Sequence, residues 1–472
     1  MKKCISILFA CCAIAGETAA MEGSLSQRIT LKTPGNRAVT YNLRETAEGG
    51  GILEADRRLP LTVRRQKTET DDEIRIVLTL TADDLLYYNV EQSFHTGLAH
   101  ENCLFYMPGF WYRKNLRSPE SAPSFHTGDS WQVREDRLST PLTGIYDERS
   151  GTYYTVLRTD TPDCEALACH NYGEVILSGK TSLGFTGFRN ADAHAALVFG
   201  FPYCEAPKSY VRKLTLAPAV RAFEKLEKGE TRRLTWTIRK GASPSYSSFV
   251  TEVWNDSFDT LDPRPVSPRH TPDEAKAILS EYFSRSYVGK YPLKFTSGVE
   301  LRTADCESTD IAEVGFVGRV LLNAFNALEY AEANGREQLA AEARSIFDSY
   351  LRYGFTPGGL IREVVDFKRE READVYSIRR QSEGLYALLN YLDYEKRHGR
   401  SHPRWEARIR TLLEKFRTLQ NPDGSFPRKF RDNLTVVDAS GGSTPSATLP
   451  LTMACVYFGD EDTSCKGSAT DG

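Results

Sequence analysis

A proline-rich segment divides the sequence into two halves that follow different hydrophobic periods. Residues 262–269 contain three prolines, which exclude a helix or a central strand at this point. Before this segment, short runs of β-branched and aromatic residues stand between Gly, Pro and Asp turns, as in a β-sandwich. After it, apolar residues recur every three or four positions, as in amphipathic helices. The chain is therefore expected to be a multidomain α+β protein.

The expected domain boundaries follow from where these two patterns start and stop. We predict a β-sandwich domain at 25–255, a linker at 256–270, a helical domain at 271–460 and an irregular tail at 461–472. Strand patterns are clearest at 74–80 and at 232–238, where polar and apolar residues alternate.

The second half contains about six helix patterns. Thr271 and Pro272 suit the N-cap and first position of one helix, and Gly335 and Gly399 suit the left-handed residue that ends two others. The predicted helices cover 272–282, 310–334, 337–353, 377–398, 402–419 and 445–458. The loops between them are short or medium, which predicts about three antiparallel helical hairpins.

A turn between two of these helices carries a motif. Residues 420–427 read Gln-Asn-Pro-Asp-Gly-Ser-Phe-Pro. Helical hairpins joined in this way resemble the (α/α)6 six-hairpin toroid of many glycoside hydrolases, and several such families carry a β-sandwich before the toroid. The resemblance covers about residues 270–460 and implies a carbohydrate-active protein. Twelve toroid helices need on the order of 350 residues, and about 200 follow the linker. The expected toroid domain is therefore incomplete, as in a truncated chain.

The N-terminus has the pattern of a bacterial-type export signal. Lys2 and Lys3 precede an apolar run at 4–15, and small residues allow cleavage after Ala20 or after Ala15. That run is too short for a membrane span, and no later run reaches the ~18 apolar residues that a span needs. We expect a signal peptide at 1–20 and a mature protein that is periplasmic, secreted or held at the cell surface.

Charge and cysteine content narrow the possible partners. A net charge of −3 provides no basic field for nucleic acid. The cysteines beyond the signal are irregularly spaced, which does not suit a disulfide framework. Cys164 and Cys169 could pair, or could bind a metal with His170, but no second ligand pair has zinc spacing. We expect no cofactor and no metal, and an oligo- or polysaccharide as partner.

Three carboxylates stand at helix starts or in loops, where toroid hydrolases place their catalytic residues. Hydrolysis of a glycosidic bond needs one carboxyl group as acid and another as base or nucleophile. Glu383 is the candidate general acid, and Asp438, in a glycine-containing loop, is the candidate second carboxylate. Asp310, three residues before Glu313 at the start of the long predicted helix, is a third candidate. Helix capping and a plain surface loop are the structural alternatives.

Arginines near helix starts are candidates for binding an acidic sugar. Arg379 and Arg380 lie in the first turn of a predicted helix, where their charge opposes the helix dipole. Two guanidinium groups suit a carboxylate such as that of a uronic acid, although internal salt bridges would explain them equally well. Arg319 begins a polar stripe on the long predicted helix. A solvated face is the usual cause of such a stripe, and on an inner toroid helix it would line the cavity.

The first half offers a candidate sugar platform. Trp111, Tyr112 and Arg113 combine aromatic rings with a cation, and Arg134 and Asp136 follow in a similar cluster. These residues are predicted to bind substrate. The alternative is a hairpin with an exposed, salt-bridged edge, which would also deter aggregation.

The leading functional hypothesis is an exported glycoside hydrolase that acts on a polysaccharide, one that could contain uronic acid, by an inverting mechanism. One alternative is a glycan-binding protein without activity, or an enzyme inactivated by truncation. Another is a toroid polysaccharide lyase, which would use a Tyr/His or Tyr/Arg pair. The sequence contains no Gly-x-Ser-x-Gly, phosphate-binding loop or His-Glu-x-x-His motif.

Overall fold

The computed structural model describes residues 23–459 apart from 34, 47–49, 117, 119, 161–171, 213–214, 297–306 and 317–318. The predicted signal peptide, the Cys164–Cys169 pair and the tail at 461–472 lie outside the described residues. The chain divides into two compact units, Met1–Pro265 and Val266–Gly472.

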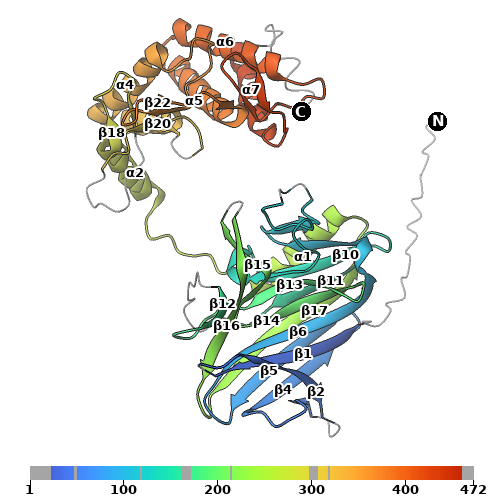
Figure 1. The fold of residues 1–472 in the computed structure, drawn as a ribbon. Helices are drawn as coiled ribbons and strands as arrows, with labels where there is room; N and C mark the ends of the chain where they lie inside the picture. The colour runs from blue at the N-terminus through green and yellow to red at the C-terminus, as the bar shows by residue number, and fades with distance from the viewer. Residues whose placement is uncertain are drawn as a thin grey trace, which may run out of the picture. The chain divides into compact units, whose positions relative to one another are not determined.

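The first unit is built from strands, and their pairings connect all seventeen that are described into one sheet. Figure 1 shows the central strands of this sheet side by side. The elements are β1 (Ser24–Lys32), β2 (Val39–Glu45), β3 (Ile52–Glu54), β4 (Leu61–Glu69), β5 (Glu73–Ala82), β6 (Leu86–Ala99), β7 (Cys103–Met107), β8 (Trp111–Arg113), β9 (Trp131–Arg134), β10 (Leu142–Asp147), β11 (Thr152–Arg158), β12 (Gly173–Ile176), β13 (Phe185–Ala191), β14 (His194–Phe201), β15 (Cys204–Arg212), β16 (Thr215–Leu226), β17 (Thr231–Ala242) and the helix α1 (Tyr246–Leu261).

Alternating apolar residues place one side of these strands in a common core. Ile29 of β1 lies opposite Val90 of β6, and Leu78 of β5 lies opposite Leu234 of β17. All four side chains are fully buried. Burial of apolar surface stabilises the fold by roughly 25 cal/mol per Å², so this alternation is what sets the register of the strands.

The predicted fold class, a β-sandwich followed by an incomplete (α/α)6 toroid, is wrong. The strands of the first unit join a single sheet, and the described residues form seven α-helices, one of which, α1, belongs to the sheet-rich unit. Shared strands make the sheet continuous, because the long strand β6 pairs with β1, β14 and β16, and the short strand β9 pairs with β13 and β15. A period of two residues shows which side chains are buried, but it does not show which strands pair.

The second unit combines six described helices with three small sheets. The helices are α2 (Pro272–Ser286), α3 (Val320–Ala333), α4 (Glu337–Tyr353), α5 (Ile378–Arg397), α6 (Pro403–Leu419) and α7 (Pro445–Phe458). The strands are β18 (Tyr287–Val288), β19 (Phe295–Thr296), β20 (Ile311–Glu313), β21 (Val364–Asp366), β22 (Arg371–Glu372), β23 (Tyr376–Ser377), β24 (Lys429–Phe430) and β25 (Val436–Asp438).

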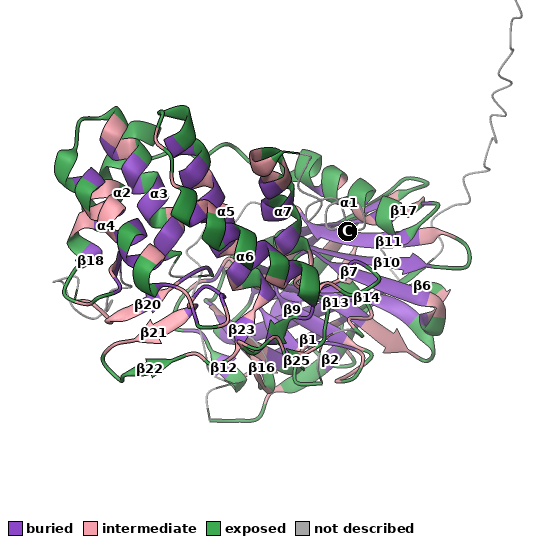
Figure 2. Ribbon diagram, turned by 90° about the horizontal axis from the view of Figure 1, so that it is seen from above, coloured by how far each residue is buried: buried purple, intermediate pink, exposed green. Residues whose placement is uncertain are grey.

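Helix α5 is the centre of the second unit and packs against α3, α6 and α7. Phe347 of α4 stacks on Tyr391 of α5, with ring centroids 3.8 Å apart. In Figure 2, buried and exposed residues alternate along α3 and α6, as expected for helices with one apolar face. Within the described residues, no helix combines the length and apolar character needed to cross a membrane.

One helix start differs from the prediction. The long helix expected from Asp310 begins at Val320, and the segment before it forms the short strand β20 and a loop. Gly315 has a φ of 78°, Phe316 of 56° and Arg319 of 42°. These left-handed residues are incompatible with a continuous right-handed helix. The loop that they form lies at the candidate site.

Candidate functional site

A cavity of about 300 Å³ lies in the second unit, between the loop before α3, the first turns of α5 and the start of α7. Its walls mix charged, hydroxyl and apolar side chains. The lining residues are Val314, Gly315, Arg319, Leu321, Leu322, Ser382, Glu383, Gly384, Tyr386, Pro445, Ser446, Leu449 and Pro450.

Glu383 is the described carboxylate that lines this cavity, and two donors hold it. The backbone N–H of Phe316 donates to Oε2, and Nε of Arg379 donates to Oε1 at 3.0 Å. The side chain of Glu383 keeps 22% of its surface exposed. Gly315 allows the loop to come this close, because a Cβ at that position would lie 2.7 Å from Oε2 of Glu383. The carboxylate is therefore fixed in position and still reachable from the cavity.

Arg319 lines the same cavity from the loop. Its Nε donates to the carbonyl oxygen of Phe316 at 3.0 Å, which fixes the direction of the side chain. Among the described residues, no carboxylate forms an ion pair with Arg319. The backbone of Phe316 therefore orients both charged groups, Glu383 through its N–H and Arg319 through its carbonyl.

Ser382 adds a buried hydroxyl to the cavity wall. Its side chain is fully buried, and its Oγ has no hydrogen-bond partner among the described residues. A buried polar group without a partner destabilises the folded state. Apolar and aromatic side chains, including Leu321 and Tyr386, make up much of the remaining wall.

A partly buried charge network connects the loop to helix α5. Arg380 lies 2.5 Å from Glu313 and 4.0 Å from Glu363. Burial raises the pKa of Glu363 to about 7 and outweighs the hydrogen bonds from the Ser377 backbone and from Gln381 that lower it. This network joins the end of β20 to the start of α5, which carries Ser382, Glu383 and Tyr386 of the cavity lining.

The other two predicted carboxylates lie outside the cavity lining. Asp310 accepts hydrogen bonds from Lys290 at 2.9 Å and Tyr291 at 3.2 Å, and the bond from Lys290 is the main cause of its lowered pKa. The Ser440 hydroxyl donates a hydrogen bond to Asp438 at 2.7 Å, and this bond is the main cause of the lowered pKa of Asp438. The three candidates, Glu383, Asp438 and Asp310, are therefore not gathered around this cavity.

The two arginines predicted to bind an acidic sugar both have carboxylate partners. Arg379 pairs with Glu383, and Arg380 pairs with Glu313. The guanidinium of Arg379 also lies 4.8 Å from the ring centroid of Phe316, in a cation–π contact. The structure thus shows the salt-bridged arrangement that was the alternative for these two residues.

The predicted sugar platform of the first unit is mostly occupied by internal contacts. Trp111 is fully buried, and its indole N–H donates to the Arg113 carbonyl at 2.9 Å. Arg134 is buried and makes two hydrogen bonds with Asp136. Tyr112 is 49% exposed, and Arg113 stacks over a tyrosine of α1. A buried indole cannot stack on a sugar, so Trp111 does not provide a binding surface in this structure.

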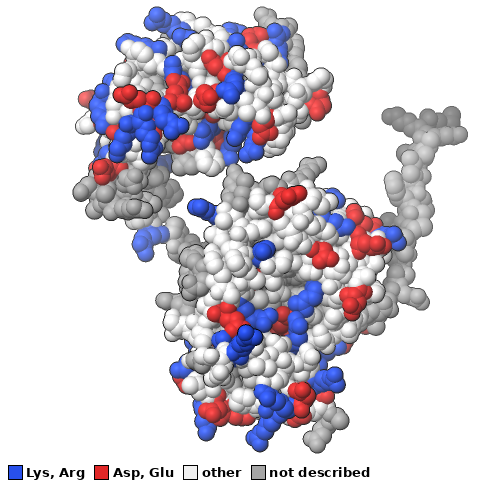
Figure 3. Space-filling model, viewed as in Figure 1, with Lys and Arg blue, Asp and Glu red and all other residues white. Residues whose placement is uncertain are grey.

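Sequence reasoning missed Ser382, Tyr386 and the loop at Gly315. The signal for the loop was present, since Gly315 and Gly318 interrupt the predicted helix pattern just before the cation Arg319. Within the described residues, no group of three His, Cys, Asp or Glu side chains could hold a metal ion. Figure 3 shows acidic and basic side chains interspersed on the visible face of each unit.

No protein family matches the sequence, and no curated protein does either. Among solved structures the chain is similar to a polysaccharide lyase, with 8% identity and a TM-score of 0.42 over 93% of this chain and 67% of that one. A bacterial glucoamylase in complex with acarbose has 8% identity and a TM-score of 0.26 over 95% of this chain and 60% of that one. An α-amylase from Clostridium perfringens has 11% identity and a TM-score of 0.28 over 43% of this chain and 53% of that one.

The names of all three denote enzymes that act on carbohydrates. The chain spans 67% of the length of the first protein, 60% of the second and 53% of the third. Similarities this distant carry no argument about activity, which has to be inferred from the residues of the cavity.

Proposed function

We propose that this chain is a carbohydrate-active enzyme and that a sugar residue of its substrate occupies the cavity beside Glu383. The observation that carries the proposal is the Glu383 carboxylate, which stays accessible in the cavity wall while Phe316 and Arg379 hold its two oxygens. A group fixed in this way can exchange a proton with a substrate without first reorganising.

The rest of the cavity suits one sugar ring. Its volume of about 300 Å³ is at the lower end of the range for small-molecule sites. Leu321, Leu322 and Leu449 provide apolar surface, and Tyr386 provides a ring with a polar tip, which together match the apolar face and the hydroxyl rim of a pyranose.

In the first candidate reaction, the enzyme hydrolyses a glycosidic bond. Both oxygens of Glu383 already accept hydrogen bonds from N–H groups, so we assign it the role of base or nucleophile and not that of acid. This reaction also needs a second carboxyl group as acid. Within the described residues, no other carboxylate lines the cavity.

The second candidate is elimination from an acidic sugar, and the residues that share the cavity with Glu383 favour it. Glu383 would take the proton from carbon 5, the electron pair would form the C4=C5 double bond, and the C4–O bond would break. Tyr386 would protonate the leaving oxygen, and Arg319 would stabilise the charge on the sugar carboxylate. This reaction needs one carboxylate and not two.

The test is to compare variants of the full chain on a panel of neutral and acidic polysaccharides. New reducing ends without ultraviolet absorbance would indicate hydrolysis, and new reducing ends with the absorbance of an unsaturated sugar would indicate elimination. Glu383→Gln should lower turnover at least about 100-fold.

Asp393→Asn is the matched control for this variant. Asp393 lies on the same helix and pairs with Arg397 at the same i,i+4 spacing, with the two charges in the reverse order, and it is outside the cavity. We expect the control to retain wild-type turnover. Equal turnover of Glu383→Gln and wild type would contradict the proposal.

A further inference from the structure

The charge of Arg319 has no counter-ion among the described residues, although its side chain is held at the cavity wall. Its Nε donates to the Phe316 carbonyl at 3.0 Å, and within the described part of the chain no carboxylate pairs with the two terminal nitrogens of the guanidinium. Many surface arginines are unpaired, but they move freely. An arginine that is held in one direction loses less side-chain entropy when it binds a ligand.

The other described charged residues next to the cavity are already paired, so the positive charge of Arg319 is the one without a described partner. Glu383, the described carboxylate of the lining, is already paired with Arg379 at 3.0 Å. Arg380 is paired with Glu313 at 2.5 Å. The cavity wall therefore carries one positive charge that none of the described side chains neutralises.

A second polar group also lacks a partner in this cavity. Ser382 is fully buried, lines the cavity, and has a hydroxyl with no hydrogen-bond partner within the part of the chain that the structure describes. A hydroxyl can donate to a carboxylate oxygen or to a sugar hydroxyl. A ligand that brought such an acceptor would satisfy a group that is otherwise costly to bury.

We propose that the cavity selects a sugar that bears a carboxylate, with Arg319 as the ion-pair partner of that carboxylate and Ser382 as a further hydrogen-bond donor. This inference rests on the proposed function and deepens it, because it names uronic-acid units as the substrate class. A planar guanidinium matches a carboxylate through two parallel hydrogen bonds, which a neutral hydroxymethyl group cannot form. The specificity for acidic sugars is thus assigned to Arg319 and not to Arg379 or Arg380.

The test uses calorimetric titration of the full chain with sugars that differ only at carbon 6. The pairs are glucuronate with glucose and galacturonate with galactose, and acetate serves as a carboxylate without a sugar. At least one uronate should bind at least about tenfold more tightly than its neutral partner and than acetate. Arg319→Gln should remove this preference, and Ser382→Ala should weaken uronate binding without lowering the melting temperature.

Arg336→Gln is the matched control. Arg336 is the N-cap residue of α4, as Arg319 is of α3, and it is exposed and outside the cavity. This control should keep the wild-type preference. Arg319→Lys retains the charge without the planar fork, so it should keep part of the preference, and it replaces Arg319→Gln if that variant does not fold.

The possible failures can be told apart. Equal binding of each uronate and its neutral partner, an unchanged preference in the Arg319 variants, or acetate binding as tight as that of the uronates would overturn this inference. These results would also remove the role of Arg319 in elimination, but a carbohydrate-active enzyme with a sugar beside Glu383 would still stand. Absence of binding to every sugar would count against both.

Discussion

Gly315 is the residue on which the position of Glu383 depends most directly. Its φ of 78° is in the left-handed region, and a Cβ would lie 2.7 Å from Oε2 of Glu383. Gly315→Ala should therefore lower the free energy of unfolding by at least the ~1 kcal/mol cost of the backbone conformation, and it should also displace the Glu383 carboxylate and reduce turnover. Chemical denaturation and an activity assay measure the two effects.

Gly335→Ala separates backbone strain from the clash. Gly335 has a similar φ of 64°, and nothing lies within 4 Å of where its Cβ would be. We expect this variant to lose about 1 kcal/mol and to keep full turnover. If the two variants behave alike, the close approach of Gly315 to Glu383 does not matter.

Glu363 makes the stability of the second unit depend on pH near neutrality. Burial raises its pKa to about 7 in the folded protein, above the ordinary value of 4.5. A raised carboxyl pKa means that the folded state binds the proton more tightly than the unfolded state does. Protonation of Glu363 therefore stabilises the fold fully below about pH 4.5, and this stabilisation is lost as the pH rises to 7.

Glu363→Gln should remove this dependence. Relative to the wild type, the variant should gain up to about 3 kcal/mol between pH 4.5 and pH 8. Urea denaturation of both proteins at several pH values would show the gain, and parallel curves across that range would contradict the assignment.

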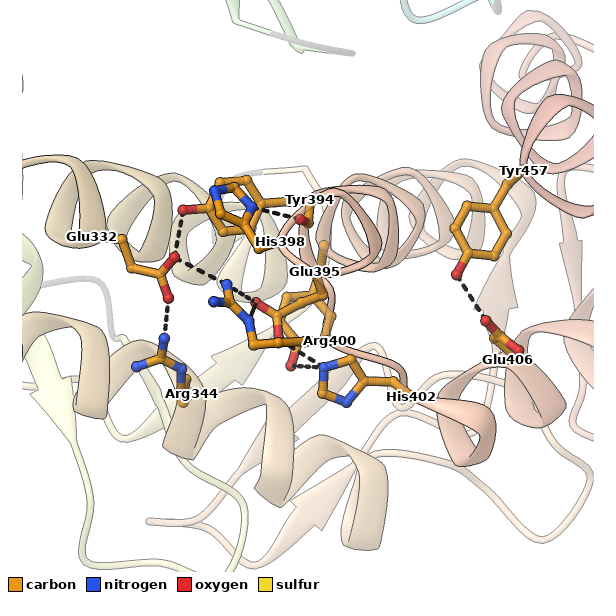
Figure 4. A network of polar contacts seen from close by, with 10 residues as sticks. Glu332, Arg344, Tyr394, Glu395, His398, Arg400, His402, Glu406 and Tyr457 are labelled. Atoms are coloured by element: carbon orange, nitrogen blue, oxygen red, sulfur yellow. Dashed lines mark hydrogen bonds and ion pairs between the residues drawn. The ribbon is translucent and has the colours of Figure 1, made fainter.

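At the scale of elements, a polar network ties the ends of several helices together (Figure 4). Glu332 at the end of α3 accepts hydrogen bonds from Tyr394 at 2.6 Å and Arg400 at 3.0 Å. Arg400 and His402, both in the segment before α6, also donate to the buried Glu395 of α5. Burial pushes the pKa of Glu395 up, but the bonds from Arg400 and His402 outweigh it and hold the pKa below its ordinary value.

Arg400→Ala should therefore destabilise the protein by about 2 kcal/mol near pH 7, because it leaves a buried carboxylate short of donors. Since the pKa values of Glu332 and Glu395 are lowered, this difference is present above pH ~4.3 and should shrink as the pH falls further. Arg397→Ala is the control, because Arg397 and Asp393 are both exposed, and it should cost less than about 0.5 kcal/mol. Equal losses would show that the network does not stabilise the helix ends.

The sequence predicts local structure here better than it predicts how elements assemble. The helices expected at 337–353 and 445–458 are found as α4 and α7 with those bounds. Their limits follow from local periodicity and from Pro445 at a helix start. The start at Asp310 was wrong because the left-handed backbone at Gly315, Phe316 and Arg319 ends the helix pattern, and of these three residues only the glycine indicates such a conformation in the sequence.

The same holds for the candidate site: a single residue could be predicted from the sequence, but the residues that surround it in the cavity could not. Glu383 could be singled out because it lies near a helix start, where loops and helix ends collect. Its grouping with Arg319, Ser382 and Tyr386 could not be predicted from the sequence, since this grouping depends on how the loop before α3 packs against α5. The pairing of all described strands of the first unit into one sheet depends in the same way on contacts between distant segments.

At the scale of the whole molecule, the two compact units meet in sequence at a segment without regular structure. Residues 262–271, between α1 and α2, are all exposed. Brief trypsin treatment should cut after Arg269 before it cuts inside either unit, because the bond after Arg264 precedes a proline and resists trypsin. Mass spectrometry of the first fragments would identify the site, and first cuts within β-strands or helices would contradict the division.

The most direct test of the central claim is a crystal structure of the full-chain Glu383→Gln variant with an oligosaccharide that the wild type cleaves. We predict a sugar ring in the cavity between the loop at 314–319, α5 and α7, with the substituted side chain facing the scissile bond and Arg319 contacting a sugar carboxylate. A sugar bound elsewhere, for example at Tyr112 and Arg113 of the first unit, with this cavity empty, would contradict the account.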